Sequence, residues 1–246
     1  MNPLIVADVD VKADLRLFCM PYAGAGASLY RRWSRSFPLS IQLCPVQLPG
    51  REERLLEPSL TSIESVVAAI MKTLPAYLDR PYALFGHSMG AKIVFELCRA
   101  IKKASYKLPE LLLVSACKAP HMPEPYPIHS LPQHEFLEGL ERYSADTSLL
   151  HEYPELLELL LPSLRSDFLL DESYVYQEEE GEDVLSIPIE AFYGTDDTEA
   201  TFDEVSGWSA YTEQFSLTAV EGGHLFLRER KHEFLNLLSS KLCCLI

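Results

Sequence analysis

Several features that would point to other classes of protein are missing from this chain of 246 residues. No apolar run is long enough to cross a bilayer, and the N-terminal stretch has no basic leader and too short an apolar core for a signal peptide. We therefore expect a cytoplasmic protein without a membrane partner. Basic residues are also scarce, since 21 Lys and Arg stand against 36 Asp and Glu. Because nucleic-acid binding needs a concentrated positive surface, the composition argues against a nucleic-acid partner.

The six cysteines show neither a disulfide framework nor a metal site. They form no Cys-x-x-Cys pair, and the histidines form no obvious ligand cluster, so we expect reduced, mostly buried thiols and no metal or bound cofactor. The C-terminal Cys243-Cys244-Leu245-Ile246 has the outline of a prenylation motif, but Lys241 is its single basic neighbour. We interpret this match as chance.

Linkers rich in Pro, Gly or Ser and internal repeats are absent as well, which favours one domain over residues 1–246. Within it, short apolar runs alternate with helical patterns. The expected strands are Leu15–Met20, Ile41–Val46, Tyr82–Phe85, Leu111–Ser115, Ile189–Tyr193 and Phe215–Val220, and the expected helices include Ser62–Leu78 and Ala91–Ala104. This alternation predicts an α/β fold with a mainly parallel sheet and helices on both faces.

The most informative motif present is Gly86-His87-Ser88-Met89-Gly90, between an apolar strand and a helix. A serine at such a turn is typical of a nucleophile elbow, which exposes the hydroxyl above the sheet. The tight turn brings neighbouring backbone close, so only glycine fits at positions 86 and 90. We therefore predict that Ser88 is a catalytic nucleophile.

A serine nucleophile needs a base and an orienting acid, and both follow it in the chain. His224 comes after an expected strand, in Glu221-Gly222-Gly223-His224, and we predict it as the base. Asp196 and Asp197 share one turn after another strand, and physical reasoning does not separate these neighbours, although we place Asp197 first. The order Ser, Asp, His is that of the α/β-hydrolase triad. The other histidines are interpreted as surface or packing residues: His87, His121, His129, His134, His151 and His232.

The stretch between Ser115 and Ile189 is far longer than an ordinary strand connection. Residues 119–174 within it are rich in leucine at helical spacing. Laid across the carboxyl ends of the strands, such helices would form a lid over Ser88 and an apolar chamber for a substrate chain. The alternative is a set of extra core helices, but the position next to the triad favours a lid.

Further motifs extend over nearly the whole chain. They are Leu17–Gly26, Leu48–Arg51 with Arg54, Gly86–Ala91 with Phe95-Glu96, Ile128–Pro132, Leu161–Asp167 with Tyr174, and Gly222–Phe226. Together they resemble the stand-alone type II thioesterases that serve polyketide and nonribosomal peptide synthases. The acid of this family follows the pattern G-x-x-D, which falls on Asp197 here. The chain departs from the family at Lys92, where an aliphatic residue is usual, and at Glu52, which replaces a small residue.

The resemblance implies an α/β-hydrolase fold and hydrolysis of acyl thioesters through an acyl-enzyme on Ser88, without metal or cofactor. It also implies that the backbone N–H groups of Met89 and Ala23 form the oxyanion hole. The partner would be an acyl-loaded carrier protein, and the enzyme itself a monomer that clears stalled or mis-primed synthases.

Three alternatives remain at this point. A carboxylesterase or lipase would share the triad but prefer oxyesters, and an acyltransferase or product-releasing thioesterase would pass the acyl group to an alcohol or amine. A hydrolase-fold binding protein without turnover is the third, and the intact Ser88, Asp197 and His224 argue against it.

Overall fold

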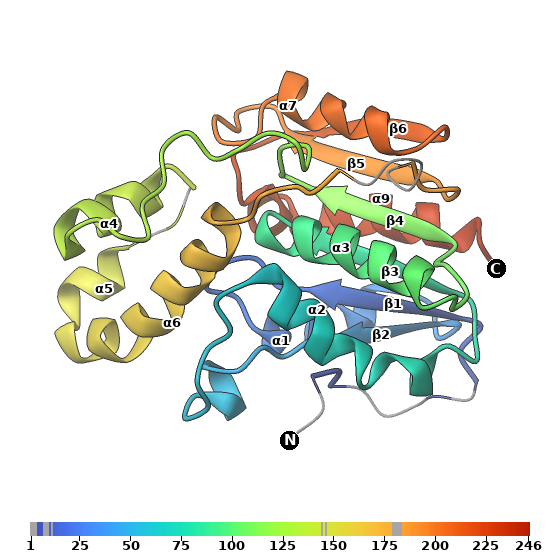
Figure 1. Cartoon of the computed structure of the whole chain (residues 1–246), viewed down its shortest axis with the longest axis horizontal. Coiled ribbons are helices and arrows are strands. Elements are labelled where there is room, and N and C mark those ends of the chain that lie inside the picture. The colour runs from blue at the N-terminus through green and yellow to red at the C-terminus, as the bar shows by residue number, and fades with distance from the viewer. Residues whose placement is uncertain (1–3, 7–9, 11, 144, 146, 179–183) are drawn as a thin grey trace.

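The structure of the chain is a computed structural model, which describes residues 4–6, 10, 12–143, 145, 147–178 and 184–246. Its centre is a fully parallel, six-stranded sheet in the order β2-β1-β3-β4-β5-β6 (Figure 1). The strands are β1 (Leu15–Met20), β2 (Ile41–Pro45), β3 (Tyr82–His87), β4 (Leu111–Ser115), β5 (Ile189–Gly194) and β6 (Phe215–Val220). Their positions along the chain and their parallel pairing confirm the predicted α/β fold.

Helices cover both faces of this sheet. The α-helices of the described residues are α1 (Ala27–Arg31), α2 (Ile63–Met71), α3 (Met89–Lys103), α4 (Gln133–Glu141), α5 (Ser148–Glu152), α6 (Pro154–Glu172), α7 (Phe202–Ser206), α8 (Phe226–Glu229) and α9 (Lys231–Cys243). Phe18 and Met20 of β1 pack in one apolar layer with α2 and α3. Leu17 and Cys19 point the other way, into a layer with α1, α8 and α9. Because both faces are covered here, residues 17–20 of β1 are apolar at successive positions rather than at alternate ones.

One predicted helix is wrong in its second half. The helix expected over Ser62–Leu78 ends at Met71, and a 3-10 turn follows over Leu74–Tyr77. Pro75 accounts for the break, because proline has no N–H to donate and disfavours the helical conformation in the residue before it. The start is as expected, since Ser62 caps α2 by accepting a hydrogen bond from the Ser65 N–H at 3.2 Å.

The inserted segment 119–174 contains α4, α5 and α6. These helices lie together at the end of the sheet toward which the arrows of β1 and β4 point (Figure 1). They bury a small apolar cluster of their own around Phe136, Leu140 and Phe168, and α6 also contacts α3. The segment therefore lies at the carboxyl ends of the strands, where parallel sheets present their functional residues.

Two further expectations concern membranes and cysteines. Within the described ranges, every helix is too short or too polar to span a bilayer. Cys19, Cys44, Cys98 and Cys117 are buried, whereas the C-terminal pair at 243 and 244 is exposed. Burial raises the pKa of the Cys44, Cys98 and Cys117 thiols to about 12, so these thiols stay protonated at neutral pH and are poor nucleophiles.

Candidate active site

Ser88 is the single residue between the end of β3 and the start of α3. Its backbone angles are φ 53° and ψ −125°, a left-handed conformation that residues with a side chain rarely adopt. The turn also requires its two glycines. A Cβ on Gly86 would lie 2.0 Å from the carbonyl oxygen of Gly90, and a Cβ on Gly90 would lie 2.6 Å from that of Met20. The local geometry is therefore that of a nucleophile elbow.

Ser88, His224 and Asp197 form one hydrogen-bonded chain. Ser88 Oγ lies 3.0 Å from His224 Nε2, and His224 Nδ1 lies 2.9 Å from Asp197 Oδ2. Because a carboxylate only accepts hydrogen bonds, Nδ1 carries the imidazole proton and Nε2 accepts from the serine hydroxyl. This arrangement can remove the proton from Ser88 as the oxygen attacks an acyl carbonyl.

The structure separates the two adjacent aspartates. The side chain of Asp197 is buried, and its Oδ1 accepts hydrogen bonds from the backbone N–H groups of Glu199 at 2.9 Å and Ala200 at 3.2 Å. These two donors fix the carboxylate with its other oxygen toward His224. Asp196 is exposed, and its backbone N–H donates to the carbonyl oxygen of Gly222 at 2.9 Å. Asp197, rather than Asp196, is thus the carboxylate placed against the imidazole.

His87, which the sequence analysis interprets as a surface or packing residue, is buried and contacts the backbone of His224. Its ring is fully buried, with Nε2 2.9 Å from the backbone oxygen of His224 and Nδ1 2.9 Å from Ser115 Oγ. Burial and the neighbouring His224 hold the pKa of His87 well below its usual value, so the ring is neutral at neutral pH. Since a carbonyl only accepts, Nε2 carries the proton and Nδ1 accepts from the Ser115 hydroxyl. His87 therefore anchors the backbone of His224 beside Ser88.

Two substitutions of His87 test this anchoring. We expect His87→Ala to lower kcat at least about tenfold, because the loop that carries His224 loses a buried hydrogen bond. His87→Gln should recover much of the loss, because its side-chain amide can reach the place of Nε2 and donate to the same carbonyl. The measurement is kcat and KM across the pH profile of each variant, with thermal unfolding as the control. Equal losses of kcat in both variants would show that donation to His224 is not what matters.

The two predicted oxyanion donors are the backbone N–H groups of Met89, which follows Ser88 directly in the chain, and of Ala23. Met89 is the first residue of α3, and the first N–H groups of a helix have no acceptor within it. Ala23 lies in the loop after β1 and lines the same cavity as Ser88. Two such backbone donors stabilise a bound carbonyl oxygen most strongly when it becomes an oxyanion.

The loop after β1 is hydrogen-bonded to the inserted segment through a carboxylate that also forms a buried ion pair. The Gly24 N–H donates to Asp167 Oδ2 of α6 at 2.7 Å, so this N–H is not available as an oxyanion donor. Arg51 donates to both oxygens of the same carboxylate, with Nη2 2.6 Å from Oδ1. Both side chains of this pair are buried. The position of the loop after β1 thus depends on α6 and on Arg51.

A cavity of about 390 Å³ opens beside Ser88 and His224. Most of its wall is apolar and comes from the inserted segment. The apolar residues include Leu140, Leu149, Leu150, Leu156, Leu160, Leu164 and Phe168. A chamber of this size and composition can hold an acyl chain whose carbonyl carbon lies at Ser88.

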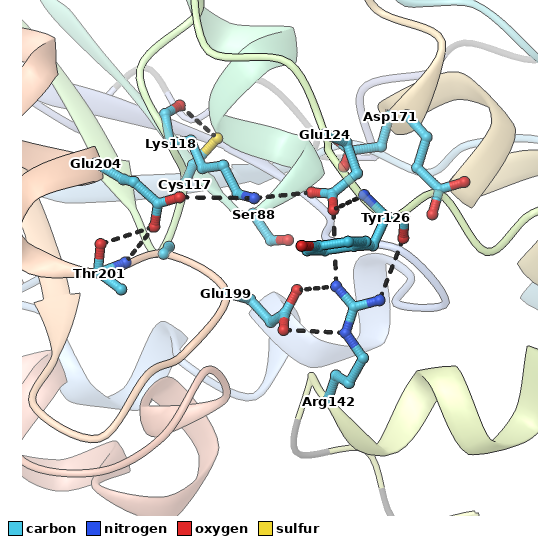
Figure 2. Close-up of polar contacts among 12 residues, drawn as sticks. Ser88, Cys117, Lys118, Glu124, Tyr126, Arg142, Asp171, Glu199, Thr201 and Glu204 are labelled. Carbon is cyan, nitrogen blue, oxygen red and sulfur yellow. Dashed lines mark hydrogen bonds and ion pairs between the residues drawn. The ribbon is translucent and has the colours of Figure 1, made fainter.

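A second cavity, of about 20 Å³, lies against the same serine and histidine and is polar. Its charged lining residues are Lys92, Lys118, Glu124, Asp171 and Glu199. Figure 2 shows the ion pairs that surround Ser88 in this view. Lys118 Nζ lies 3.0 Å from Glu124 Oε2, and Arg142 donates to both carboxylate oxygens of Glu199, at 2.7 and 3.1 Å. The nucleophile therefore stands between an apolar chamber and a charged one.

Other titratable residues have structural partners. His129 Nδ1 lies 2.6 Å from Glu172 Oε2, and His121 Nδ1 lies 2.9 Å from the Tyr211 hydroxyl. Among the described residues, no three or more of the His, Cys, Asp and Glu side chains come together in a way that could hold a metal ion.

Comparison with known proteins places this site in a family. The family model described as Thioesterase domain matches residues 15–242. The chain is 38% identical over 238 residues to the gramicidin S biosynthesis protein GrsT of Aneurinibacillus migulanus, covering 96% of this chain and 92% of that protein. It is 35% identical over 230 residues to the thioesterase PikA5 of Streptomyces venezuelae, covering 93% and 81% of the two chains.

Solved structures agree with the sequence relatives. The RedJ thioesterase from the prodiginine biosynthetic pathway of Streptomyces coelicolor superposes with a TM-score of 0.85 at 31% identity, over 93% of this chain and 90% of that one. The type II thioesterase BorB from the borrelidin biosynthetic cluster superposes with a TM-score of 0.81 at 31% identity, over 96% and 94%. The likeness thus extends over the sheet and the inserted helices together.

Proposed function

This chain belongs to the thioesterase family, and from that premise we propose that it is a type II, editing thioesterase of nonribosomal peptide or polyketide synthesis. Its substrate is an acyl group held as a thioester on the phosphopantetheine arm of a carrier protein. The observation that carries the proposal is the hydrogen-bonded chain of Ser88, His224 and Asp197 at the wall of an apolar chamber. The length of the match to relatives named as biosynthetic thioesterases supports it.

In the first half of the proposed reaction, Ser88 attacks the thioester carbonyl. His224 Nε2 takes the hydroxyl proton, and Asp197 stabilises the imidazolium that forms. The carbonyl oxygen becomes an oxyanion between the N–H groups of Met89 and Ala23. The C–S bond then breaks, and the imidazolium returns the proton to the departing pantetheine thiolate. The acyl group is left as an ester on Ser88.

In the second half, water attacks the ester on Ser88. His224 takes a proton from the water and gives it to Ser88 Oγ as the C–O bond breaks, which releases the carboxylic acid and restores the starting state. The leucine-rich chamber holds the acyl chain during both steps. The product is a discarded acyl group, and the carrier protein is freed for another cycle.

The proposed partner is an acyl-loaded carrier protein, and the proposed working form of the enzyme is a monomer. A pantetheine arm is long and slender, so the carrier domain itself can stay outside while the thioester reaches Ser88. The proposal predicts that the carrier contributes to binding, and therefore that KM is lower for a carrier-bound acyl group than for the same group on free pantetheine.

We also propose that residues 119–174 form a mobile lid over the chamber. Two observations support it: α4 to α6 share a small apolar cluster of their own, and α5 has no buried residue. We expect amide hydrogen exchange in α4 and α5 to be faster than in β3 and β4, and to slow when a non-hydrolysable acyl-pantetheine analogue binds. Helix α2, which has as many residues as α4, is the matched control. Exchange in α4 and α5 as slow as in the sheet, with no response to the analogue, would mean a fixed wall.

One comparison of substrates tests the proposed function against its alternatives. The same acyl group is offered as a pantetheine thioester and as an oxyester, and the released acid is measured with and without an added alcohol or amine. The proposal expects the thioester to have the higher kcat/KM and water to be the acceptor. Preference for the oxyester would indicate a carboxylesterase or lipase, and acyl transfer to the added nucleophile would indicate an acyltransferase.

A further inference from the structure

We propose that Asp167 of α6 is a positioning residue for the reaction, which holds the loop after β1, residues 21–26, in the shape that receives the oxyanion. The inference rests on the proposed thioesterase function, in which Ala23 of this loop and Met89 of α3 donate to the oxyanion. The side chain of Asp167 is fully buried, whereas Leu164, about one turn earlier on α6, lines the chamber. Asp167 therefore acts through the loop and not on the substrate.

The carboxylate of Asp167 is the centre of a buried hydrogen-bond network. Its Oδ2 accepts from the Gly24 N–H at 2.7 Å, and the Arg51 guanidinium donates to both of its oxygens, with Nη2 2.6 Å from Oδ1. A charged acceptor forms a stronger hydrogen bond than a neutral one, and the low dielectric of a buried site strengthens it further. The Gly24 N–H is therefore held firmly against α6.

This bond lies in the middle of a tight turn. The Ala25 N–H donates to the Tyr22 carbonyl at 2.9 Å, and Gly24 has a φ of 81°. Both features are typical of a type II turn with glycine at its third position. The peptide plane that carries the Gly24 N–H and the plane that carries the Ala23 N–H meet at the α-carbon of Ala23. Fixing the first plane thus restricts the direction in which Ala23 can donate.

Two further contacts hold the same loop. Arg51 Nη1 donates to the Ala25 carbonyl at 3.2 Å. Leu164 of α6 packs closely on Gly24, where a Cβ would lie 2.7 Å from Leu164 Cδ2. Asp167 joins these contacts into one unit, because it binds Arg51 as well as Gly24.

The end of α6 is also bound to the helix that follows Ser88. Lys92 Nζ of α3 donates to the backbone oxygen of Asp171 at 3.0 Å and lies 2.9 Å from the carboxylate of the same residue. Lys92 is about one turn after Met89, whose N–H is the other proposed oxyanion donor. Residues 167–171 of α6 therefore bridge the two segments that carry the two proposed donors.

The expected consequence of losing this bridge is a loss of catalysis without a loss of substrate binding. A displacement of about 1 Å at a catalytic group can lower the rate about a hundredfold. An oxyanion donor exerts most of its effect in the transition state, whereas the chamber that holds the acyl chain has its own lining residues. We therefore expect kcat to fall while KM stays nearly constant.

The test compares two ways of removing the Asp167 carboxylate. Arg51→Met with Asp167→Leu removes the buried pair and the acceptor for Gly24, whereas Asp167→Asn keeps an oxygen for Gly24 but leaves Arg51 without its counter-charge. Apolar replacement of a buried ion pair often maintains stability, while removal of one partner lowers it. We expect the double variant to melt at the higher temperature and yet to lose more kcat, roughly tenfold to hundredfold, with KM within about threefold of wild type.

A second readout is the affinity of two pantetheine analogues that carry a six-carbon chain. In the first, a difluoromethylene group replaces the thioester sulfur of hexanoyl-pantetheine. Ser88 Oγ bonds to the carbonyl carbon of this ketone, the hydroxyl proton passes to His224, and the carbonyl oxygen becomes an alkoxide. In the second, a methylene replaces the thioester carbonyl, so that no oxyanion forms. The ratio of the two dissociation constants should shift in the double variant by about the same factor as kcat, because only the ketone needs the oxyanion donors.

The matched control is Glu190→Leu with Lys241→Met. It removes another ion pair between distant segments, with Nζ 2.7 Å from Oε2, near the amino end of β5 and away from Ser88. Its kcat and its ratio of dissociation constants should match wild type. If the double variant at positions 51 and 167 does not fold, Asp167→Ala, which also removes the acceptor for Gly24, takes its place in both readouts.

Three results would overturn the inference and leave the thioesterase function intact. The first is an unchanged kcat in the variants that lack the acceptor. The second is an equal loss of affinity for both analogues, which would indicate general damage to the site. The third is a larger loss of kcat in Asp167→Asn than in the double variant, so that activity follows stability alone. Failure of wild type to hydrolyse hexanoyl-pantetheine, while it hydrolyses the matching oxyester, would instead overturn the proposed function and the inference together.

Discussion

Replacing Ser88 with alanine is expected to lower thioester turnover by a factor on the order of 10³ or more. The variant removes the only atom that forms the acyl-enzyme, while the remaining backbone donors and the chamber can still bind substrate. It should fold normally, because a small side chain at a turn contributes little packing. Active-site residues serve activity and often lower the stability of the fold. The melting temperature of Ser88→Ala should therefore equal that of wild type or be slightly higher.

The measurement for Ser88→Ala is single-turnover release of acid from an acyl thioester, with thermal unfolding followed in parallel. Ser36→Ala, which alters an exposed serine of a 3-10 turn, is the matched control and should behave as wild type. Thioesterase activity retained in Ser88→Ala would remove Ser88 from the proposed mechanism. Loss of the fold in that variant would show that the hydroxyl has a structural role instead.

Replacing Asp197 with asparagine is expected to lower kcat by a factor on the order of 10³ to 10⁴. Because Glu199 and Ala200 N–H groups bind Oδ1, the asparagine oxygen would take that place and its NH₂ group would face His224. An imidazole beside a donor must accept at Nδ1, so its proton moves to Nε2. In this tautomer Nε2 cannot accept the proton of Ser88, and the imidazolium also loses its counter-charge.

Asp196→Asn is the matched variant, because it makes the same chemical change one residue away on an exposed side chain. Its kcat should stay within about threefold of wild type, as is usual for surface substitutions. The measurement is kcat for both variants with one acyl thioester, under conditions in which both are folded. The reverse ranking of the two variants would assign the orienting role to Asp196.

Much of the fold could be predicted because its signals are local. Each strand is a short apolar run between turn residues, and the elbow is encoded by two glycines whose Cβ atoms would collide with backbone. The error in the helix after Ser62 was also local. Its apolar stripe continues past Met71, but Pro75 lacks a backbone N–H donor and breaks the helix. A prediction from periodicity alone does not include that effect.

The parts of the site that could not be predicted depend on contacts between distant segments. The choice between Asp196 and Asp197 is made by two backbone N–H groups that orient one carboxylate. The anchoring role of His87 requires the carbonyl of His224, which is 137 residues away. The pair of Lys92 and Asp171 joins α3 to the end of α6, and neither residue alone indicates a cavity. Such contacts follow from packing and not from spacing along the chain.

The most direct test of the central claim is intact mass spectrometry of an acyl-loaded carrier protein mixed with this enzyme. The account predicts that the carrier loses the mass of its acyl group and keeps its phosphopantetheine arm. It also predicts that enzyme quenched early carries the same acyl mass, located on Ser88 by peptide mapping, and that Ser88→Ala shows neither change. An acyl group that remains on the carrier, or leaves it without ever being found on Ser88 under conditions that trap acyl-enzymes, would contradict the account.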